Sequence, residues 1–387
     1  MEKLKIGVIG AGTMGSGISQ VSATAGHETL LFDADPKMVS RAKQSHADTM
    51  AKLVEKGKVT RESADKILAS IAYASHPSEF SGCDFVIEAI VENLDFKQKL
   101  FNDIEKIVDE DCILATNTSS LSVTSIAAVC NKPSRVIGIH FFNPAPLMQL
   151  VEIVKGLATS ADIETRTKEM VAGLGKAPVL AKDTPGFIVN RIARPYYGES
   201  IRIYEEGISD FATIDWAMKE HGFKMGPFEL MDLIGNDINY TVTETVWSQL
   251  FFDPRYKPSL TQKRLFEAKR FGRKSGQGYY SYAQGNVLTE PKKESVQAEK
   301  IFMRVLSMLI NEAADALYLG IATRDDIDMA MTRGVNYPKG LLKWCDEIGA
   351  GKILDQLQSL KEEYSEDRYR PSVLLKRMVQ EKKKFYA

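Results

Sequence analysis

Apolar and polar positions alternate in two ways along this chain, and the change falls near residue 185. Before it, short β-rich apolar runs are separated by stretches with helical spacing, a pattern typical of a mostly parallel sheet with helices on both faces. From Gly186 to about Tyr280 the strand pattern is gone and the spacing is that of helices. The expected strands are Leu4–Ile9, Thr29–Phe32, Asp84–Ala89, Cys112–Ala115, Val136–His140, Leu150–Val154 and Val179–Ala181.

An insertion interrupts the first part of the chain. Residues 36–70 follow the second expected strand and have the charged, amphipathic pattern of two helices joined at Gly57. Lysines 52, 56 and 58 cluster around this turn, and the i, i+4 spacing places Lys52 and Lys56 on one helix face. These lysines form either a cationic binding site or an ordinary solvated surface.

The helical part contains an internal repeat. The segment Glu205–Met218 recurs as Tyr318–Met331, displaced by 113 residues. Three further matches are displaced by 114 residues: Gly226 with Gly340, Asp232 with Asp346, and Gly235 with Gly349. The tail Gly272–Tyr280 of the first copy has no match in the second, which is therefore expected to be a degenerate version.

These patterns predict three domains. The first spans residues 1–185, the second 186–283, and the third, a duplicate of the second, 296–387. Between the two helical domains, the glycine- and proline-containing residues 283–295 are expected to form a linker.

Composition excludes several classes of protein. With 387 residues, of which 44% are apolar, the chain can bury the cores of two or three domains, and a formal net charge of −1 gives no field that attracts nucleic acid or an anionic membrane. No apolar run approaches the ~20 residues that span a bilayer, and the first strand begins so near Met1 that we expect no signal peptide. The four cysteines lack C-x-x-C spacing and are expected to be reduced thiols of a cytoplasmic protein.

The clearest motif follows the first expected strand. Gly10, Gly12 and Gly15 form G-x-G-x-x-G between that strand and a helix, and Asp33 ends the next strand about 20 residues on. The first glycine permits a tight turn, the second lets a pyrophosphate approach the helix N-terminus, and the third lets the helix pack on the sheet. Asp33 is placed to bind ribose hydroxyls and to repel a 2′-phosphate, which favours NAD over NADP. The alternative is a tight turn without a ligand.

A histidine and a glutamate form a second candidate. His140 ends a strand in IGIHFFNPAP, and Glu152 lies twelve residues on, inside another apolar strand. A carboxylate in such a run is costly unless it is paired. A pair would fix the imidazole tautomer and make His140 a general base for a substrate hydroxyl, whereas an unpaired histidine there would be a core residue.

Polar residues also follow other expected strands. ATNTSSL, residues 115–121, begins at the carboxyl edge of the sheet, where ligands bind in open α/β folds, and EAIVEN, residues 88–93, closes a neighbouring strand. The hydroxyls and amides of 115–121 point to a nicotinamide or substrate oxygen, or Ser120 or Ser122 caps the next helix. In KDTPGFIVNR, residues 182–191, Asn190 amid apolar residues implies a satisfied buried amide or a substrate contact.

Taken in order, these motifs resemble the 3-hydroxyacyl-CoA dehydrogenase family over residues 4–283. The resemblance is carried by HFFNPAPLMQLVEI, KDTPGFIVNR, MGPFELMDLIG and GRKSGQGYY. It implies an α/β Rossmann-type NAD-binding domain followed by all-α domains of the 6-phosphogluconate dehydrogenase C-terminal type. It also implies the reversible, NAD-dependent oxidation of an L-3-hydroxyacyl-CoA to a 3-ketoacyl-CoA in fatty-acid metabolism, such as β-oxidation.

The resemblance assigns roles to individual residues. His140 is implied as the general base and Glu152 as its partner, while Ser119 and Asn190 orient the substrate. Lys52 and Lys56 are implied to contact the CoA phosphates, and no metal is expected. The implied NAD-site residues are Gly10, Gly12, Thr13, Met14, Gly15, Asp33, Glu92, Lys97 and Asn117.

Two other functions and two assembly states stay open. The chain could be a catalytically silent NAD-binding or structural relative, or a dehydrogenase of a hydroxy acid without CoA. In the family that this chain resembles, the short members are dimers that lack the last helical domain. We therefore expect either a homodimer or a pseudo-dimeric monomer in which Val296–Ala387 covers the dimer surface.

Overall fold

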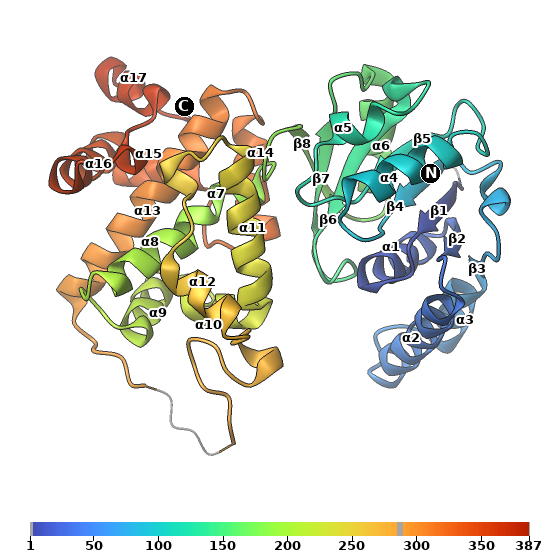
Figure 1. The fold of residues 1–387 in the computed structure, drawn as a ribbon, viewed down its shortest axis with the longest axis horizontal. Helices are drawn as coiled ribbons and strands as arrows, with labels where there is room; N and C mark the ends of the chain where they lie inside the picture. Colours follow the sequence, from blue (N-terminus) through green and yellow to red (C-terminus); the bar gives the residue numbers. More distant parts are fainter. Residues whose placement is uncertain (1–2, 285–288, 387) are drawn as a thin grey trace. The chain divides into compact units, whose positions relative to one another are not determined.

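The computed structural model describes residues 3–284 and 289–386 and divides into two compact units between Thr184 and Pro185. The first unit combines a sheet with helices, and the second is helical (Figure 1). The second unit includes both of the helical segments that the sequence separates. Residues 285–288 of the expected linker lie outside the described residues.

One eight-stranded sheet forms the centre of the first unit, with the order β3-β2-β1-β4-β5-β6-β7-β8. Its strands pair in parallel except β6 and β7, which are antiparallel. The strands are β1 (Lys5–Ile9), β2 (Glu28–Phe32), β3 (Ile71–Tyr73), β4 (Phe85–Glu88), β5 (Ile113–Thr116), β6 (Val136–Phe141), β7 (Leu150–Lys155) and β8 (Ala177–Lys182). Strands β4, β5 and β6 are buried along their whole length, as the inner strands of a covered sheet are.

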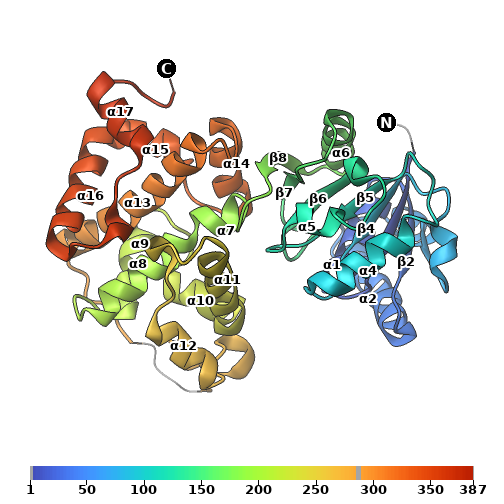
Figure 2. The ribbon, with the colours of Figure 1, turned by 45° about the horizontal axis from the view of Figure 1, so that its top comes forward.

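Helices of the first unit cover this sheet, some in direct contact with its strands and others through a neighbouring helix (Figure 2). They are α1 (Thr13–Thr24), α2 (Pro36–Glu55), α3 (Arg61–Ala69), α4 (Leu94–Ile104), α5 (Val123–Ala127) and α6 (Ala161–Gly173), with 3-10 turns η1 (Pro77–Phe80) and η2 (Pro133–Arg135). The two helices predicted in residues 36–70 are α2 and α3, and the turn between them contains Gly57 at a φ of 65°. The mostly parallel sheet is confirmed, whereas β3 is a strand that the sequence analysis missed.

The second unit is built around α13, a helix of 24 residues. It packs against α8 and α9 of the first helical segment and against α15, α16 and α17 of the second, so the two segments form one unit. The helices are α7 (Val189–Ile192), α8 (Arg194–Glu205), α9 (Phe211–Glu220), α10 (Pro227–Ile234), α11 (Asn236–Gln249), α12 (Leu260–Glu267), α13 (Ser295–Tyr318), α14 (Arg324–Gly334), α15 (Leu341–Ile348), α16 (Ala350–Tyr364) and α17 (Val373–Glu381). Three 3-10 turns join them: η3 (Pro254–Tyr256), η4 (Arg273–Ser275) and η5 (Asp367–Tyr369).

The two helical segments make matching local contacts. Asp215 accepts the first backbone N–H groups of α10 at 2.8 and 2.9 Å, and Asp328 accepts those of α15 at 2.9 and 3.0 Å. A tyrosine hydroxyl donates to each carboxylate, Tyr280 to Asp215 at 2.7 Å and Tyr386 to Asp328 at 2.9 Å. The same helix junction is therefore built twice.

The matching tail corrects one expectation. Backbone N–H groups of residues 279 and 280 donate to Asp232, and those of residues 385 and 386 donate to Asp346. The second segment therefore keeps the end of the tail that we expected it to lack. The match escapes sequence alignment because Tyr280 lies 48 residues after its aspartate whereas Tyr386 lies only 40 after its own.

A buried carboxylate of each segment is bound by the other segment. Glu312 of α13 accepts from Arg191 Nε at 2.6 Å and from Arg255 Nη1 at 2.9 Å. Glu199 of α8 accepts from Arg304 Nε at 2.6 Å, and from the hydroxyl of Tyr369 at 2.7 Å. Tyr256, which corresponds to Tyr369, donates in the same way to the first of these carboxylates.

Each residue of one cluster has its counterpart in the other, 113 positions away. The pairs are Arg191 with Arg304, Glu199 with Glu312, Arg255 with Arg368, and Tyr256 with Tyr369. Across a two-fold axis, every contact occurs twice, with the roles of the two copies exchanged. The two segments therefore meet through reciprocal contacts inside one chain.

Neither a membrane-spanning helix nor a disulfide is found among the described residues. In the described part of the chain, no helix has both the length and the apolar character needed to cross a membrane. The four cysteines are free and buried, and burial raises the pKa of each thiol, in Cys112 and Cys345 to about 12.

Candidate active site

His140 and Glu152 occupy directly paired positions of the antiparallel strands β6 and β7. Side chains at paired positions point to the same face, and here Nδ1 of the histidine lies 2.7 Å from Oε2 of the glutamate. Both side chains are buried, and the ring of Phe142 lies 4.5 Å from the imidazole. A carboxylate that accepts from Nδ1 places the ring proton there and makes Nε2 the proton-accepting nitrogen.

A second buried cluster lies where β4 and β5 end. Glu88, the last residue of β4, accepts from the ammonium of Lys97 at 2.6 Å and from the hydroxyl of Thr116 at 2.7 Å. The lysine and the glutamate are both 1% exposed, so the pair neutralises two charges that burial would otherwise make costly. Lys97 was expected at the cofactor site and Glu88 was named within EAIVEN at the sheet edge, but their pairing was not predicted.

Glu92 organises the loop after β5. Its carboxylate accepts from the Thr118 hydroxyl at 2.5 Å and from the backbone N–H groups of Ser119 and Ser120 at 3.0 and 3.2 Å. Burial raises its pKa, but the nearby charge of Lys97 and these hydrogen bonds outweigh burial, and the pKa lies below its ordinary value. Glu92 is thus an anion that holds the loop in place.

Asn117 connects this loop to the histidine strand. Its backbone N–H donates to the carbonyl of Glu88 at 2.8 Å, and its side-chain oxygen accepts the N–H of Phe141 at 2.9 Å. The ends of β4, β5 and β6 are therefore tied together beside His140. Within this loop, the helix-capping alternative holds for Ser122, which is the N-cap of α5.

The glycine motif has the geometry that a pyrophosphate site requires. Gly10 has a φ of 106°, and a Cβ on Gly15 would lie 1.7 Å from the Gly10 carbonyl oxygen, so neither position tolerates a side chain. A Cβ on Gly12 would meet no atom within 4 Å, so this N-cap of α1 faces open space, and no side chain caps the helix. An open helix N-terminus of this kind binds phosphate groups through its N–H donors.

Asp33, at the end of β2, fixes the glycine loop. Its Oδ2 atom accepts the N–H of Ala11 at 2.7 Å, and Oδ1 accepts the N–H of Asp35 at 2.9 Å. The acid predicted to bind ribose therefore also holds the backbone around the phosphate position. Thr13 and Met14 provide the first turn of α1 beside it.

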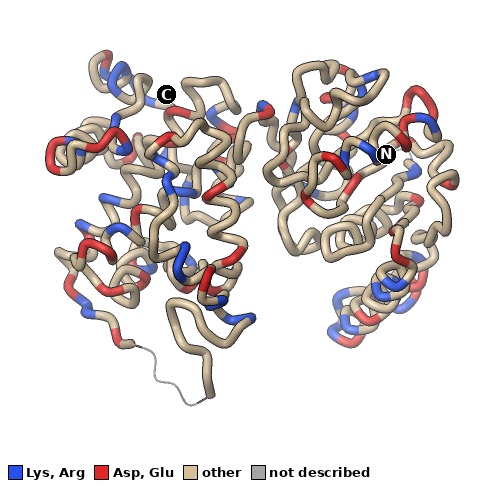
Figure 3. Tube along the Cα trace, in the orientation of Figure 1, with Lys and Arg blue, Asp and Glu red and all other residues tan. Residues whose placement is uncertain are grey.

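The remaining predicted residues lie elsewhere. Lys52 is in the last turn of α2 and Lys56 caps that helix; both are exposed, and neither has an ion-pair partner among the described residues. Carboxylates are interspersed with the cations along α2 and α3 (Figure 3), so the solvated-surface alternative stays open. Asn190 lies in α7 of the second unit, and its role as a substrate contact stays a prediction.

Comparisons with known proteins give matches over most of the chain. Residues 5–184 match the family model described as 3-hydroxyacyl-CoA dehydrogenase, NAD binding domain, and residues 186–282 and 301–385 match that of its C-terminal domain. The chain is 36% identical to 3-hydroxyadipyl-CoA dehydrogenase of Escherichia coli (strain K12), over 96% of both chains. It is 41% identical to human mitochondrial hydroxyacyl-coenzyme A dehydrogenase, over 71% of this chain and 90% of that one.

A solved structure extends the similarity to the whole fold. The crystal structure of 3-hydroxybutyryl-CoA dehydrogenase from Escherichia coli K12 superposes with a TM-score of 0.93 at 34% identity. The match covers 98% of this chain and 99% of that chain, so it includes the second helical segment.

Proposed function

Because this chain belongs to the 3-hydroxyacyl-CoA dehydrogenase family, whose members are NAD-dependent oxidoreductases, we propose that His140 is its general base and Glu152 the partner that orients it. The reaction is the reversible oxidation of an L-3-hydroxyacyl-CoA to a 3-ketoacyl-CoA in fatty-acid metabolism. The observation that carries this proposal is the buried pair, with 2.7 Å between Nδ1 and Oε2.

Oxidation of the alcohol requires that two groups leave it together. His140 Nε2 takes the hydroxyl proton, and Glu152 stabilises the imidazolium that results. NAD, when bound, supplies the acceptor for the hydride that leaves C3, and a carbonyl forms as both groups depart. In the reverse direction the imidazolium returns the proton as a general acid.

Other residues hold the reactants. Ser119, whose N–H is fixed by Glu92, orients the substrate oxygen together with Asn190. Asn117 and the Glu92–Lys97 ion pair, at 3.1 Å, position the end of the cofactor that reacts. Holding the two reacting groups side by side contributes a large part of the rate in such reactions.

The opposite end of the cofactor lies at the glycine loop. Gly12 leaves room for the pyrophosphate at the N-terminus of α1, between Gly10 and Gly15, and Thr13 and Met14 extend that turn. Asp33 accepts the ribose hydroxyls and disfavours a 2′-phosphate, so NAD is the preferred cofactor.

The acyl-CoA is held by the helical insertion. Lys52 and Lys56, exposed cations four residues apart, contact the CoA phosphates. This assignment distinguishes a CoA substrate from a free hydroxy acid, because the free acid lacks the phosphates that these lysines contact.

We further propose that the helical domains, residues 186–283 and 296–387, arose by duplication and that the chain is a pseudo-dimeric monomer. The reciprocal clusters around Glu199 and Glu312 support this proposal, since they repeat one interface about a two-fold axis. A sedimentation mass of one chain is expected; a dimer that buries residues 186–283 against a second copy would contradict it. The free, buried cysteines agree with a cytoplasmic location.

Loss of NADH absorbance with acetoacetyl-CoA tests the function. The wild-type protein should turn over rapidly with NADH and poorly with NADPH, and His140→Ala should lose about 10²- to 10⁴-fold in kcat while still binding NADH. Equal activity of His140→Ala would exclude the proposed base. Tight NADH binding without turnover of any acyl-CoA would indicate the catalytically silent alternative.

A further inference from the structure

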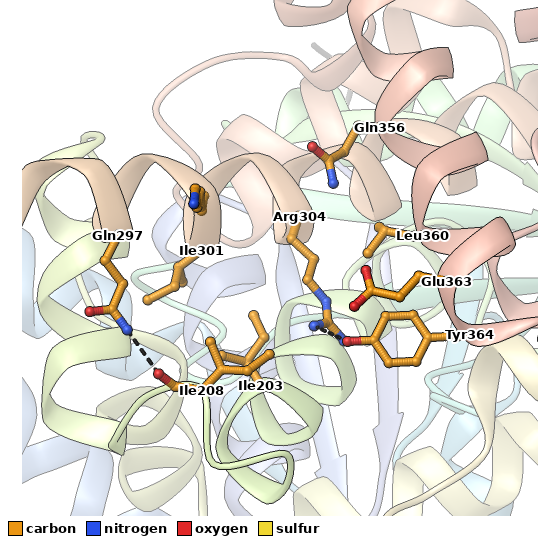
Figure 4. A pocket seen from close by; sticks show the side chains of 10 residues that line it. Ile203, Ile208, Gln297, Ile301, Arg304, Gln356, Leu360, Glu363 and Tyr364 are labelled. Carbon is orange, nitrogen blue, oxygen red and sulfur yellow. Dashed lines mark hydrogen bonds between the residues drawn. The ribbon is translucent and has the colours of Figure 1, made fainter.

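A cavity of about 360 Å³ lies in the second unit, between α8, α13 and α16. Four aliphatic side chains line it: Ile203 and Ile208 from the first helical segment, and Ile301 and Leu360 from the second. Figure 4 shows the three isoleucines close together with Gln297 beside them, and Leu360 among Arg304, Gln356, Glu363 and Tyr364. The volume of the cavity is in the range of small-molecule sites, which begins at about 300 Å³.

Arg304 forms the polar base of this cavity, but its donors are already used. Its guanidinium donates to Glu199 at 2.6 Å, to Glu206 at 2.9 and 3.1 Å, and to the hydroxyls of Tyr364 and Tyr369 at 3.0 Å each. A ligand therefore gains little from this arginine and must be recognised by the remaining polar side chains.

Lys300 is the cation of the cavity lining that can bind a ligand. It lies on α13 one turn before Arg304, it is exposed, and within residues 3–284 and 289–386 it has no ion pair or hydrogen bond. The position 113 residues earlier is Phe187, which is 1% exposed. The second segment thus has a solvated ammonium group where the first has a buried aromatic ring.

Two further polar side chains of the cavity lining, Gln356 and Glu363 on α16, determine which ligand can bind. Among the described residues the amide of Gln356 has no partner, so its N–H₂ group can donate to an anion. The carboxylate of Glu363 repels every anion and repels a doubly charged one most, so it disfavours phosphates and intact CoA relative to a single carboxylate. One cation, one amide donor and an aliphatic wall select a singly charged, amphipathic anion.

We propose that this cavity binds the carboxylate of a short- or medium-chain fatty acid, with the headgroup at Lys300 and Gln356 and the chain against Ile203, Ile208, Ile301 and Leu360. The site lies wholly in the second unit and shares no residue with the His140–Glu152 site. It is therefore a site for a free acid in addition to the proposed acyl-CoA site.

Calorimetric titration of octanoate into the full-length protein tests this. One site per chain with a Kd of about 1 mM or tighter is expected, and each methylene removed from the chain should weaken binding about fourfold. Lys300→Glu should weaken binding at least about tenfold, because it removes a charge-assisted hydrogen bond and adds repulsion. Ile208→Asp, at a position that is 46% exposed, should also weaken binding at least about tenfold, because it places a charge among the aliphatic side chains.

Matched controls separate this cavity from other sites. Lys376→Glu makes the same charge change at an exposed position of α17 outside the cavity and should leave the affinity unchanged. Lys300→Glu should retain wild-type kcat and KM with acetoacetyl-CoA, which shows that it is folded. The titration is repeated with saturating NAD⁺ and acetoacetyl-CoA, which occupy the dehydrogenase site.

Octanoate that still binds under those conditions, and that Lys300→Glu releases, supports the proposal. Absence of saturable heat, or an affinity that neither Lys300→Glu nor Ile208→Asp changes, would overturn it. Binding that NAD⁺ and acetoacetyl-CoA abolish would place the acid in the acyl site and would also overturn it. A protein that lacked dehydrogenase activity but bound octanoate would refute the proposed function alone.

Discussion

His140 and Glu152 lie opposite each other in register on the antiparallel strands β6 and β7, and Nδ1 and Oε2 are 2.7 Å apart. Because the register fixes this pair, Glu152→Gln should fold normally. The amide of glutamine can donate to Nδ1 and so favour the wrong tautomer. We expect kcat with acetoacetyl-CoA to fall by about 10²- to 10⁴-fold with little change in KM, measured by steady-state NADH oxidation. Near-wild-type kcat would show that the carboxylate does not orient the base.

Asp33 should determine the choice of cofactor. Asp33→Asn keeps an oxygen that can accept the N–H of Ala11 but removes the charge that repels a 2′-phosphate. The ratio of kcat/KM for NADPH to that for NADH should rise about tenfold or more. Asp33→Ala also loses the bond to the loop and should weaken both cofactors. An unchanged ratio in Asp33→Asn would mean that discrimination lies elsewhere.

Lys52 and Lys56 should matter only for substrates that carry CoA. Replacing either with glutamine should raise KM for acetoacetyl-CoA about two- to fivefold, the size expected of an exposed ion pair, and added salt should reduce the difference. A free 3-hydroxy acid should be unaffected. The control is Lys66→Gln on α3, whose cation pairs with Glu62 at 2.7 Å. Equal effects from control and test variants would favour the solvated-surface alternative.

Both reciprocal carboxylates should contribute to stability, Glu312 more than Glu199. Glu312→Gln leaves buried Arg191 without its anion, and breaking such a pair costs about 3–5 kcal/mol. Glu199→Gln should cost less, because Arg304 keeps Glu206 at 2.9 Å. Urea unfolding should show a loss for both variants that is larger for Glu312→Gln. Glu299→Gln, which removes an exposed carboxylate beside His221, serves as control and should show no such loss. No loss in Glu312→Gln would show that this buried carboxylate does not stabilise the contact between the two segments.

His46 should make the first unit less stable in acid. Burial lowers its pKa below 6.5, outweighing the opposing effect of the Ser16 carbonyl, and its ring nitrogens contact Ser16 and Tyr73 at 2.9 Å. The unfolded chain binds a proton near 6.5 that the folded chain resists, so stability is lost as the pH falls below that value. Unfolding free energies measured between about pH 7.5 and 5.5 should fall less in His46→Gln. His27, whose pKa burial also lowers, should maintain part of the slope.

Most of the sheet could be predicted because most of its strands are continuous apolar runs. The exception is Ile71–Tyr73, three residues with an exposed centre, which pairs with β2 alone and leaves almost no periodic signal. The antiparallel direction of β7 was not predicted, although the sequence contains its signal. Only residues 142–149 join β6 to β7, which is too short for the crossover that parallel neighbours require.

The geometry of the glycine loop could be predicted because local spacing determines it. The His140–Glu152 contact was expected for another reason, that a carboxylate inside an apolar strand is costly unless it is paired. The pairing of Glu88 was not predicted because its partner Lys97 reaches it from a helix, and a contact between elements has no sequence period. The reciprocal clusters were missed for the same reason. A shared spacing of 113 residues marks equivalent positions but does not say that Arg191 binds the glutamate of the other segment.

Arg191 and Glu312 are 121 residues apart in one polypeptide. Two surfaces on separate chains come apart when the solution is diluted, because their encounter depends on protein concentration. Two surfaces on one chain meet at a local concentration that the connecting segment sets. The reciprocal clusters should therefore stay assembled in a single molecule, and the heat stability of this protein should not vary between dilute and concentrated samples.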